Sequence, residues 1–238
     1  AWEDKGPALD FEESQWWSLL KSAKKMDELI TKHSTIMDKY DPDKRVGLIV
    51  DEWGSWLAVE PGTNPGFLYQ QNTIRDAMVA ALTLNIFHKH ADRVHMANIA
   101  QTVNVLQAMI LTEGDKMVKT PSYHVFDLYK IHQDADLVAS YGDESDTLSY
   151  TVSKKDGMMS ISLCNYSLTE TQTLDVAGEF GDTIAEARYI TADKVDAHND
   201  FEHPENITIK DFDGAKLVDG QLSITILPMS VATVRISE

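Results

Sequence analysis

Apolar residues in the first half of the chain follow two different spacings. From residue 12 to residue 40 they recur every three or four positions, which predicts a helix with one buried stripe. The stripe consists of Trp16, Leu19, Leu20, Ala23, Met26, Leu29 and Ile30. Residues 46–50 are continuously apolar, which favours a strand covered on both faces in a parallel sheet over an alternating surface strand.

The same alternation of helix and strand continues further along the chain. A second helical pattern covers residues 69–90, a short strand pattern covers residues 94–97, and a third helical pattern begins at Thr120 and Pro121 and runs to about residue 133. Helices that alternate with buried strands are typical of βα units. The first half therefore predicts part of an α/β layer or barrel.

After Tyr141 the pattern changes to short alternating segments separated by Asp-Gly and Gly-Asp turns, as in an antiparallel sandwich. The predicted strands are residues 148–152, 159–163, 171–176, 185–191 and 222–226. We place the boundary between residues 140 and 147, which gives a first domain of residues 1–143 and a β-sandwich domain of residues 144–238.

Two buried strands and three helices cannot close a parallel barrel, which needs eight strands and about 250 residues. Either the first domain is an unusual small sheet, or the chain is a piece of a larger protein. We favour the second interpretation, and the opening at Ala1 rather than methionine agrees with the removal of something upstream.

Charge and cysteine content narrow the classes of partner. The formal net charge of −17 would repel nucleic acid and anionic membranes, and no apolar run approaches the roughly 20 residues of a membrane-spanning helix. The single cysteine, Cys164, cannot form an internal disulfide and is expected to be buried and inert. The fold therefore does not depend on an oxidising compartment, which favours the cytoplasm over secretion.

Glu52 is the strongest candidate for chemistry. It follows the apolar run 46–50, so it would lie at the carboxyl end of a parallel strand, where barrel enzymes gather their catalytic groups. Trp53 and Trp56 follow closely, and aromatic rings beside a carboxylate are typical of sugar sites. The alternative is an Asp-Glu pair that ends a strand by chance.

Asp51 is not expected to act together with Glu52, because consecutive side chains of a strand point to opposite faces. Asp51 would then lie on the outer side, tied to a backbone or arginine donor. A retaining glycosidase needs two carboxyl groups roughly 5–5.5 Å apart, and no second carboxylate has an equally good setting.

Asn98 and Gln101 follow the next predicted strand and would reach the same end of the sheet, where they could bind sugar hydroxyls or satisfy loop backbone. His88 and His90 are two residues apart on a helix and point in different directions, which argues against a metal pair. We interpret all eight histidines as structural or surface residues.

Three motifs occur in a fixed order: Asp-Glu-Trp at 51–53, Gln-Gln-Asn-Thr-Ile-Arg-Asp at 70–76, and Ala-Asn-Ile-Ala-Gln-x-Val-Asn-Val at 97–105. With the rest of residues 46–133, they resemble glycoside hydrolase family 51, and most closely its α-L-arabinofuranosidases. The likeness extends upstream through Trp2, Lys5-Gly6 and Phe11, and downstream through residues 198–204 and 227–231. It therefore covers nearly the whole chain.

The resemblance implies a (β/α)8 barrel followed by a β-sandwich of jelly-roll type. Strands ending at Glu52 and near Asn98 would be the seventh and eighth of the barrel. The family nucleophile falls on Glu52, the glutamine that contacts arabinofuranose falls on Gln101, and Trp53 and Trp56 match positions near the sugar pocket. The family's acid/base glutamate, at the end of the fourth strand, has no counterpart here, so the resemblance implies a missing N-terminal portion.

The implied activity is retaining hydrolysis of terminal α-L-arabinofuranosyl groups from arabinoxylan, arabinan or their oligosaccharides, with no metal or organic cofactor. Family members commonly assemble as hexamers, so a homo-oligomer is expected. Two alternatives stay open at this point: an endoglucanase or β-xylosidase on the same scaffold, and a non-catalytic carbohydrate-binding piece.

Overall fold

A computed structural model describes residues 5–142, 145–178 and 180–237. Trp2, part of the resemblance, and residues 143 and 144, at the expected domain boundary, lie outside these ranges. Within them, no helix combines the length and the apolar character needed to cross a bilayer.

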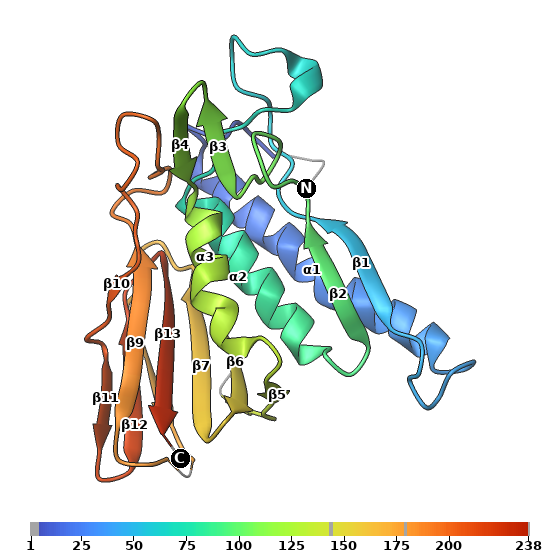
Figure 1. The fold of residues 1–238 in the computed structure, drawn as a ribbon, viewed down its shortest axis with the longest axis vertical. Helices are drawn as coiled ribbons and strands as arrows, with labels where there is room; N and C mark the ends of the chain where they lie inside the picture. Colours follow the sequence, from blue (N-terminus) through green and yellow to red (C-terminus); the bar gives the residue numbers. More distant parts are fainter. Residues whose placement is uncertain (1–4, 143–144, 179, 238) are drawn as a thin grey trace.

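Three helices form the middle of the molecule (Figure 1). They are α1 (Glu13–Met37), α2 (Ile74–Lys89) and α3 (Pro121–Tyr129), which continues into the short 3-10 helix η2 (Lys130–His132). All three expected helices are confirmed, but α2 begins later than the apolar pattern suggests. The reason is the cap: the Thr73 hydroxyl accepts a hydrogen bond from the Arg75 N–H (3.2 Å), and the Asp76 carboxylate accepts one from the Thr73 N–H (2.8 Å).

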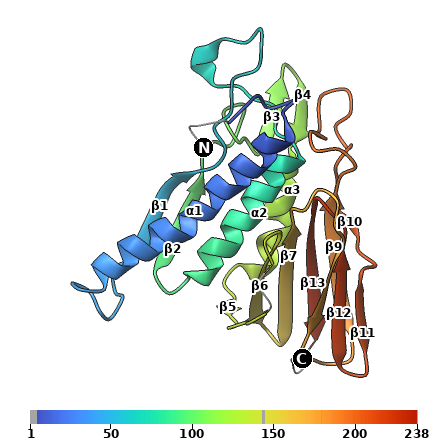
Figure 2. The same ribbon diagram turned by 180° about the vertical axis from the view of Figure 1, so that it is seen from behind.

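The strands β1 (Leu48–Trp53) and β2 (Val94–Ile99) form a parallel pair on one side of the helices, as expected from residues 46–50 and 94–97 (Figures 1 and 2). One face of the pair packs on the helical layer. The other face is open, with Ile49 44% and Met96 55% exposed. The prediction that the first of these strands is covered on both faces is therefore wrong for the described part of the chain, which holds no element over that face.

Two antiparallel sheets form a β-sandwich on the other side of the helices. The larger sheet runs in the order β10 (Lys210–Asp211), β9 (Ile184–Thr191), β13 (Ser230–Ser237), β7 (Met158–Asn165), β6 (Leu148–Lys155) and β5 (Asp136–Leu137). The smaller sheet runs in the order β11 (Ala215–Val218), β12 (Gln221–Ile226) and β8 (Gln172–Val176). All five predicted strands are present, and apolar side chains from both sheets, such as Leu163, Ile224 and Val234, fill the space between them.

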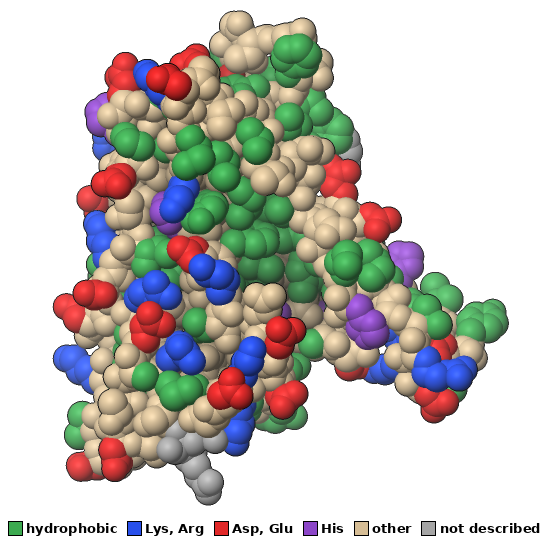
Figure 3. Space-filling view, in the orientation of Figure 1, with side chains coloured by type: hydrophobic (Ala, Val, Ile, Leu, Met, Phe, Trp, Pro, Cys, Tyr) green, Lys and Arg blue, Asp and Glu red, His purple; other side chains and the backbone are tan. Residues whose placement is uncertain are grey.

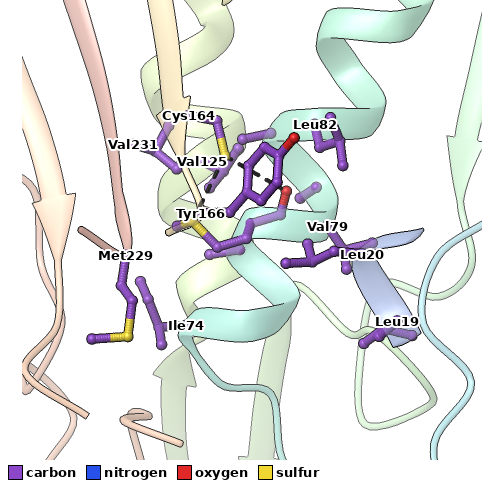
Figure 4. Packing of buried hydrophobic residues seen from close by; sticks show 14 of the residues in the cluster. Leu19, Leu20, Ile74, Val79, Leu82, Val125, Cys164, Tyr166, Met229 and Val231 are labelled. Atoms are coloured by element: carbon purple, nitrogen blue, oxygen red, sulfur yellow. Dashed lines mark hydrogen bonds between the residues drawn. The ribbon is translucent and has the colours of Figure 1, made fainter. Parts of the chain in front are cut away.

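The helices and the sandwich share one hydrophobic core. Figure 4 shows Cys164 of β7 and Tyr166, which follows that strand, with Val231 of β13, packed against Leu82 of α2 and Val125 of α3. Cys164 is fully buried, as expected, and burial raises the pKa of its thiol well above the ordinary value. The two halves of the chain are therefore joined by packing as well as by sequence.

A small hairpin completes the fold beyond the carboxyl end of β2 (Figure 1). It consists of β3 (Ile110–Glu113) and β4 (Lys116–Lys119), and Leu111 and Val118 pack in a separate small core beneath it. A 3-10 turn, η1 (Pro65–Phe67), lies in the loop between β1 and α2.

Candidate active site

The carboxyl end of β1 contains one residue more than the facing segment of β2. Val50 pairs with Ala97 and Trp53 pairs with Ile99, so three steps along β1 match two steps along β2. Such a bulge breaks the alternation of side chains and is frequent beside active sites, where it re-aims a side chain. Here it leaves Asp51 and Glu52 both exposed.

This bulge corrects the expectation for Asp51. Strict alternation predicted that Asp51 lies on the outer side of the strand, tied to a backbone or arginine donor. The side chain is exposed instead, and none of the described residues forms an ion pair with it. Asp51 is therefore not held by a donor beneath the strand. It adds a second negative charge beside Glu52.

Trp53 points away from the open face. Its side chain is 5% exposed and packs on the helical layer, with its ring 5.3 Å from the Phe87 ring and 6.1 Å from the Phe126 ring. Because Glu52 precedes it and is exposed, the two side chains leave the strand on different sides. In the described part of the chain Trp53 is therefore a core residue that anchors the strand end, and its contact with a sugar stays a prediction.

Asn98 and Gln101 lie at the same edge as Glu52. Asn98 is exposed and stands two residues after the exposed Met96, so both belong to the open face of β2. The Ala100 N–H donates a hydrogen bond to the Trp53 carbonyl (2.8 Å), which holds the chain after β2 against the end of β1. Gln101 follows directly and is exposed. The structure thus brings together three of the predicted site residues.

Trp56 occupies the loop after β1. It is 40% exposed, while its two neighbours Ser55 and Leu57 are buried. Its ring therefore presents an apolar surface near the strand end that carries Glu52. Of the two tryptophans singled out in the sequence, Trp56 has the exposure that contact with a sugar ring requires.

The described ranges hold no group of three or more His, Cys, Asp or Glu side chains arranged to bind a metal ion. Figure 3 shows apolar side chains gathered in the middle of the molecule, between this strand pair and the sandwich. An open edge with a carboxylate, two amides and an indole has the chemistry of a carbohydrate site.

Comparison with models of known protein families shows which family this chain belongs to. Residues 51–230 match the family described as the α-L-arabinofuranosidase C-terminal domain, beginning one residue before Glu52. The chain belongs to this family. The resemblance to the C-terminal portion of glycoside hydrolase family 51 is thereby confirmed.

Individual arabinofuranosidases are similar to this chain in sequence and in structure. An intracellular exo-α-L-arabinofuranosidase of Bacteroides ovatus is 42% identical over 98% of this chain and 48% of its own length. An intracellular exo-α-(1→5)-L-arabinofuranosidase of Streptomyces lividans is 26% identical over 93% of this chain and 37% of its own length. The crystal structure of the arabinofuranosidase from Xanthomonas axonopodis pv. citri superposes with a TM-score of 0.91 at 42% identity, over 100% of this chain and 50% of that one. The chain spans about half the length of these relatives or less.

Proposed function

We propose that this chain is the C-terminal part of a retaining exo-acting α-L-arabinofuranosidase and that Glu52 is its nucleophile. The observation that carries the proposal is the exposed carboxylate of Glu52 at a bulged strand end, beside Asn98 and Gln101, in a chain 42% identical to a named exo-α-L-arabinofuranosidase over nearly all its length. A terminal furanoside could approach this edge from the open face.

The open face of β1 and β2 indicates what the rest of the full protein would contribute. In the proposal, β1 and β2 are the seventh and eighth strands of a (β/α)8 barrel, and residues 144–238 are a jelly-roll sandwich domain after a barrel portion of residues 1–143. Earlier strands would cover Ile49 and Met96, which are 44% and 55% exposed in the described chain. An N-terminal portion would also supply the acid/base carboxyl group.

The reaction then has two steps. A carboxylate oxygen of Glu52 attacks the anomeric carbon, and the glycosidic oxygen leaves with a proton from the acid/base group. Water, deprotonated by the same group, then attacks the anomeric carbon and releases Glu52, so the configuration is retained. Asn98 and Gln101 would donate hydrogen bonds to sugar hydroxyls, and the Trp56 ring would pack on the apolar face of the sugar.

The relatives guide the choice of substrate and location. We propose arabinoxylan, arabinan and their oligosaccharides as substrates, because two relatives are named exo-α-L-arabinofuranosidases. Both are also named intracellular, which supports a cytoplasmic location. A homo-oligomer, expected to be a hexamer, completes the proposal.

The test uses the full natural protein that contains this chain and p-nitrophenyl α-L-arabinofuranoside as substrate. Glu52→Gln should lower kcat/KM by on the order of 10³-fold or more, since removal of a nucleophile abolishes the covalent route. Asp175→Asn, the same change of carboxylate to amide on an exposed position of β8, is the matched control and should retain activity. Equal activity of Glu52→Gln and wild type would refute the assignment, and a preference for the β-D-xylopyranoside would replace the proposed substrate.

A further inference from the structure

The loop that leaves β1 after Glu52 is held by two buried glutamine side chains. The Ser55 N–H donates a hydrogen bond to Oε1 of Gln107 (2.7 Å), and the Leu57 N–H donates one to Oε1 of Gln70 (2.9 Å). Gln107 is 0% and Gln70 is 1% exposed. The two residues held in this way, Ser55 and Leu57, flank Trp56, and Ser55 lies only three residues after Glu52.

Gln107 connects this loop to the helical layer. Its Nε2 group donates to the Asp76 carbonyl in the first turn of α2 (2.7 Å) and to the Ser122 hydroxyl in the first turn of α3 (3.0 Å). A single amide thus fixes the loop relative to the beginnings of two helices. Since the amide is fully buried, each of these hydrogen bonds forms away from competing water.

Gly54 lets the loop approach this amide. Its φ of +136° is a backbone conformation that residues with a side chain rarely adopt. A Cβ at this position would also lie 3.2 Å from Oε1 of Gln107, a tight contact with the acceptor of the Ser55 hydrogen bond. A glycine at position 54 therefore lets the backbone of the loop come close enough for the Ser55 N–H to reach the side chain of Gln107.

We propose that Gln107, with Gln70, is a positioning residue for the nucleophile: the two amides fix the loop so that Glu52 and Trp56 hold their places at the edge of the site. The inference rests on the proposed function of Glu52. The strand end needs such support because the bulge between Val50 and Trp53 interrupts regular pairing with β2 at that point. A catalytic group must be held within about 0.5 Å of its productive place, and a displacement of about 1 Å can lower a rate by about 10²-fold.

Three variants of the full natural protein test this role. Gln107→Met keeps the volume but removes both the acceptor and the donor. Gln71→Met is the matched control, because Gln71 is also a buried amide beside α2, but its Nε2 donates to the Asn199 carbonyl (3.0 Å) rather than holding the loop. Gln107→Glu is the conservative variant, since a protonated carboxyl offers an acceptor to Ser55 and a donor to Asp76.

The readout is kcat and KM on p-nitrophenyl α-L-arabinofuranoside, with thermal unfolding followed in parallel. Gln107→Met should lower kcat by about 10²-fold, with a smaller change in KM, whereas Gln71→Met should keep the wild-type kcat. The Gln107→Glu variant should approach wild-type kcat at low pH and lose activity relative to wild type as pH rises, because the ionised carboxylate no longer donates to Asp76.

Three other results would count against the positioning role or the proposed function. If Gln107→Met has the same kcat as Gln71→Met, the positioning role is overturned while the function of Glu52 stands. If Gln107→Met does not fold, the ratio of Gln107→Glu to wild-type kcat decides, and a ratio independent of pH overturns the role. If Glu52→Gln, measured alongside, keeps wild-type activity, the proposed function fails and the positioning role falls with it.

Discussion

Trp53 and Trp56 stand three residues apart, yet they face different surroundings. The first is 5% exposed and packs between Phe87 and Phe126, and the second is 40% exposed in the loop after the strand. Side chains so placed make different contributions. The buried ring stabilises the fold, whereas the proposal gives the exposed ring a contact with the sugar.

Substitution of each tryptophan by alanine should separate these contributions. Trp53→Ala should lower the free energy of unfolding by about 3–5 kcal/mol, the usual cost of removing a large buried aromatic side chain. Trp56→Ala should change stability by far less and raise KM for an arabinofuranoside. Urea denaturation and steady-state kinetics would check both, and the reverse pattern would contradict the placement of the two rings.

At the scale of elements, α2 depends on Thr73, the residue that caps its N-terminus. The helix is buried along almost its whole length, and its N-terminus is closed by the reciprocal hydrogen bonds of Thr73 and Asp76. Thr73→Ala removes the side-chain oxygen that caps the first turn. We expect a loss of about 1 kcal/mol in the free energy of unfolding.

Thr169→Ala, the same change at an exposed loop position, serves as the control and should be within about 0.5 kcal/mol of wild type. Chemical denaturation of the two variants gives the comparison. Equal stabilities would show that the cap of α2 is dispensable.

Period and composition were sufficient to predict the long elements. The three helices follow from apolar spacings of three to four residues, the five sandwich strands from alternation, and β1 and β2 from short apolar segments. Shorter elements have no such signal: β5 and β10 contain two residues each, and the hairpin of β3 and β4 buries only Leu111 and Val118 within its strands. The expected strands do not include β13, which lies near the centre of the larger sheet. Its residues are nearly all buried, so they do not show the alternation of buried and exposed positions that predicted the other sandwich strands.

The site was predicted less completely than the fold. Glu52, Asn98 and Gln101 do lie at one edge, because parallel strands end together. The exposure of Asp51 follows from a bulge that is defined by the pairing of β1 with β2, more than 40 positions further along the chain, and no local pattern reveals it. The hydrogen bond from Ser55 to Gln107 is of the same kind, since only the folded chain brings the two residues together.

At the scale of the whole molecule, a histidine lies where the helices meet the sandwich. Both ring nitrogens of His132 are 2.6 Å from serine hydroxyls, Ser153 on β6 and Ser162 on β7, and its ring centre is 5.0 Å from that of His88 on α2. Tyr129 packs beside it at 5.6 Å. Burial, and then the neighbouring His88, lowers the pKa of His132 to about 3, and burial lowers that of His88 to about 4.

These depressed pKa values predict that acid weakens the molecule at this junction. Above pH 6.5 both the folded and the unfolded states hold His132 neutral; below it only the unfolded state takes up the proton, until the pH approaches the folded pKa. As the pH falls through this range, the free energy of unfolding should therefore decrease by about 1.4 kcal/mol per pH unit because of His132 alone. His132→Gln should lessen the dependence of unfolding free energy on pH between 6.5 and 4.5, measured by urea denaturation, and an unchanged dependence would contradict the assignment.

The most direct test of the central claim is to trap the covalent intermediate. The full natural protein is incubated with an activated 2-fluoro-α-L-arabinofuranosyl donor, digested, and examined by mass spectrometry, while NMR follows the configuration of the first product from a normal substrate. The account predicts an arabinosyl adduct on the peptide that contains Glu52, none in Glu52→Gln, and retention of configuration. An adduct on another residue, or inversion of configuration, would contradict it.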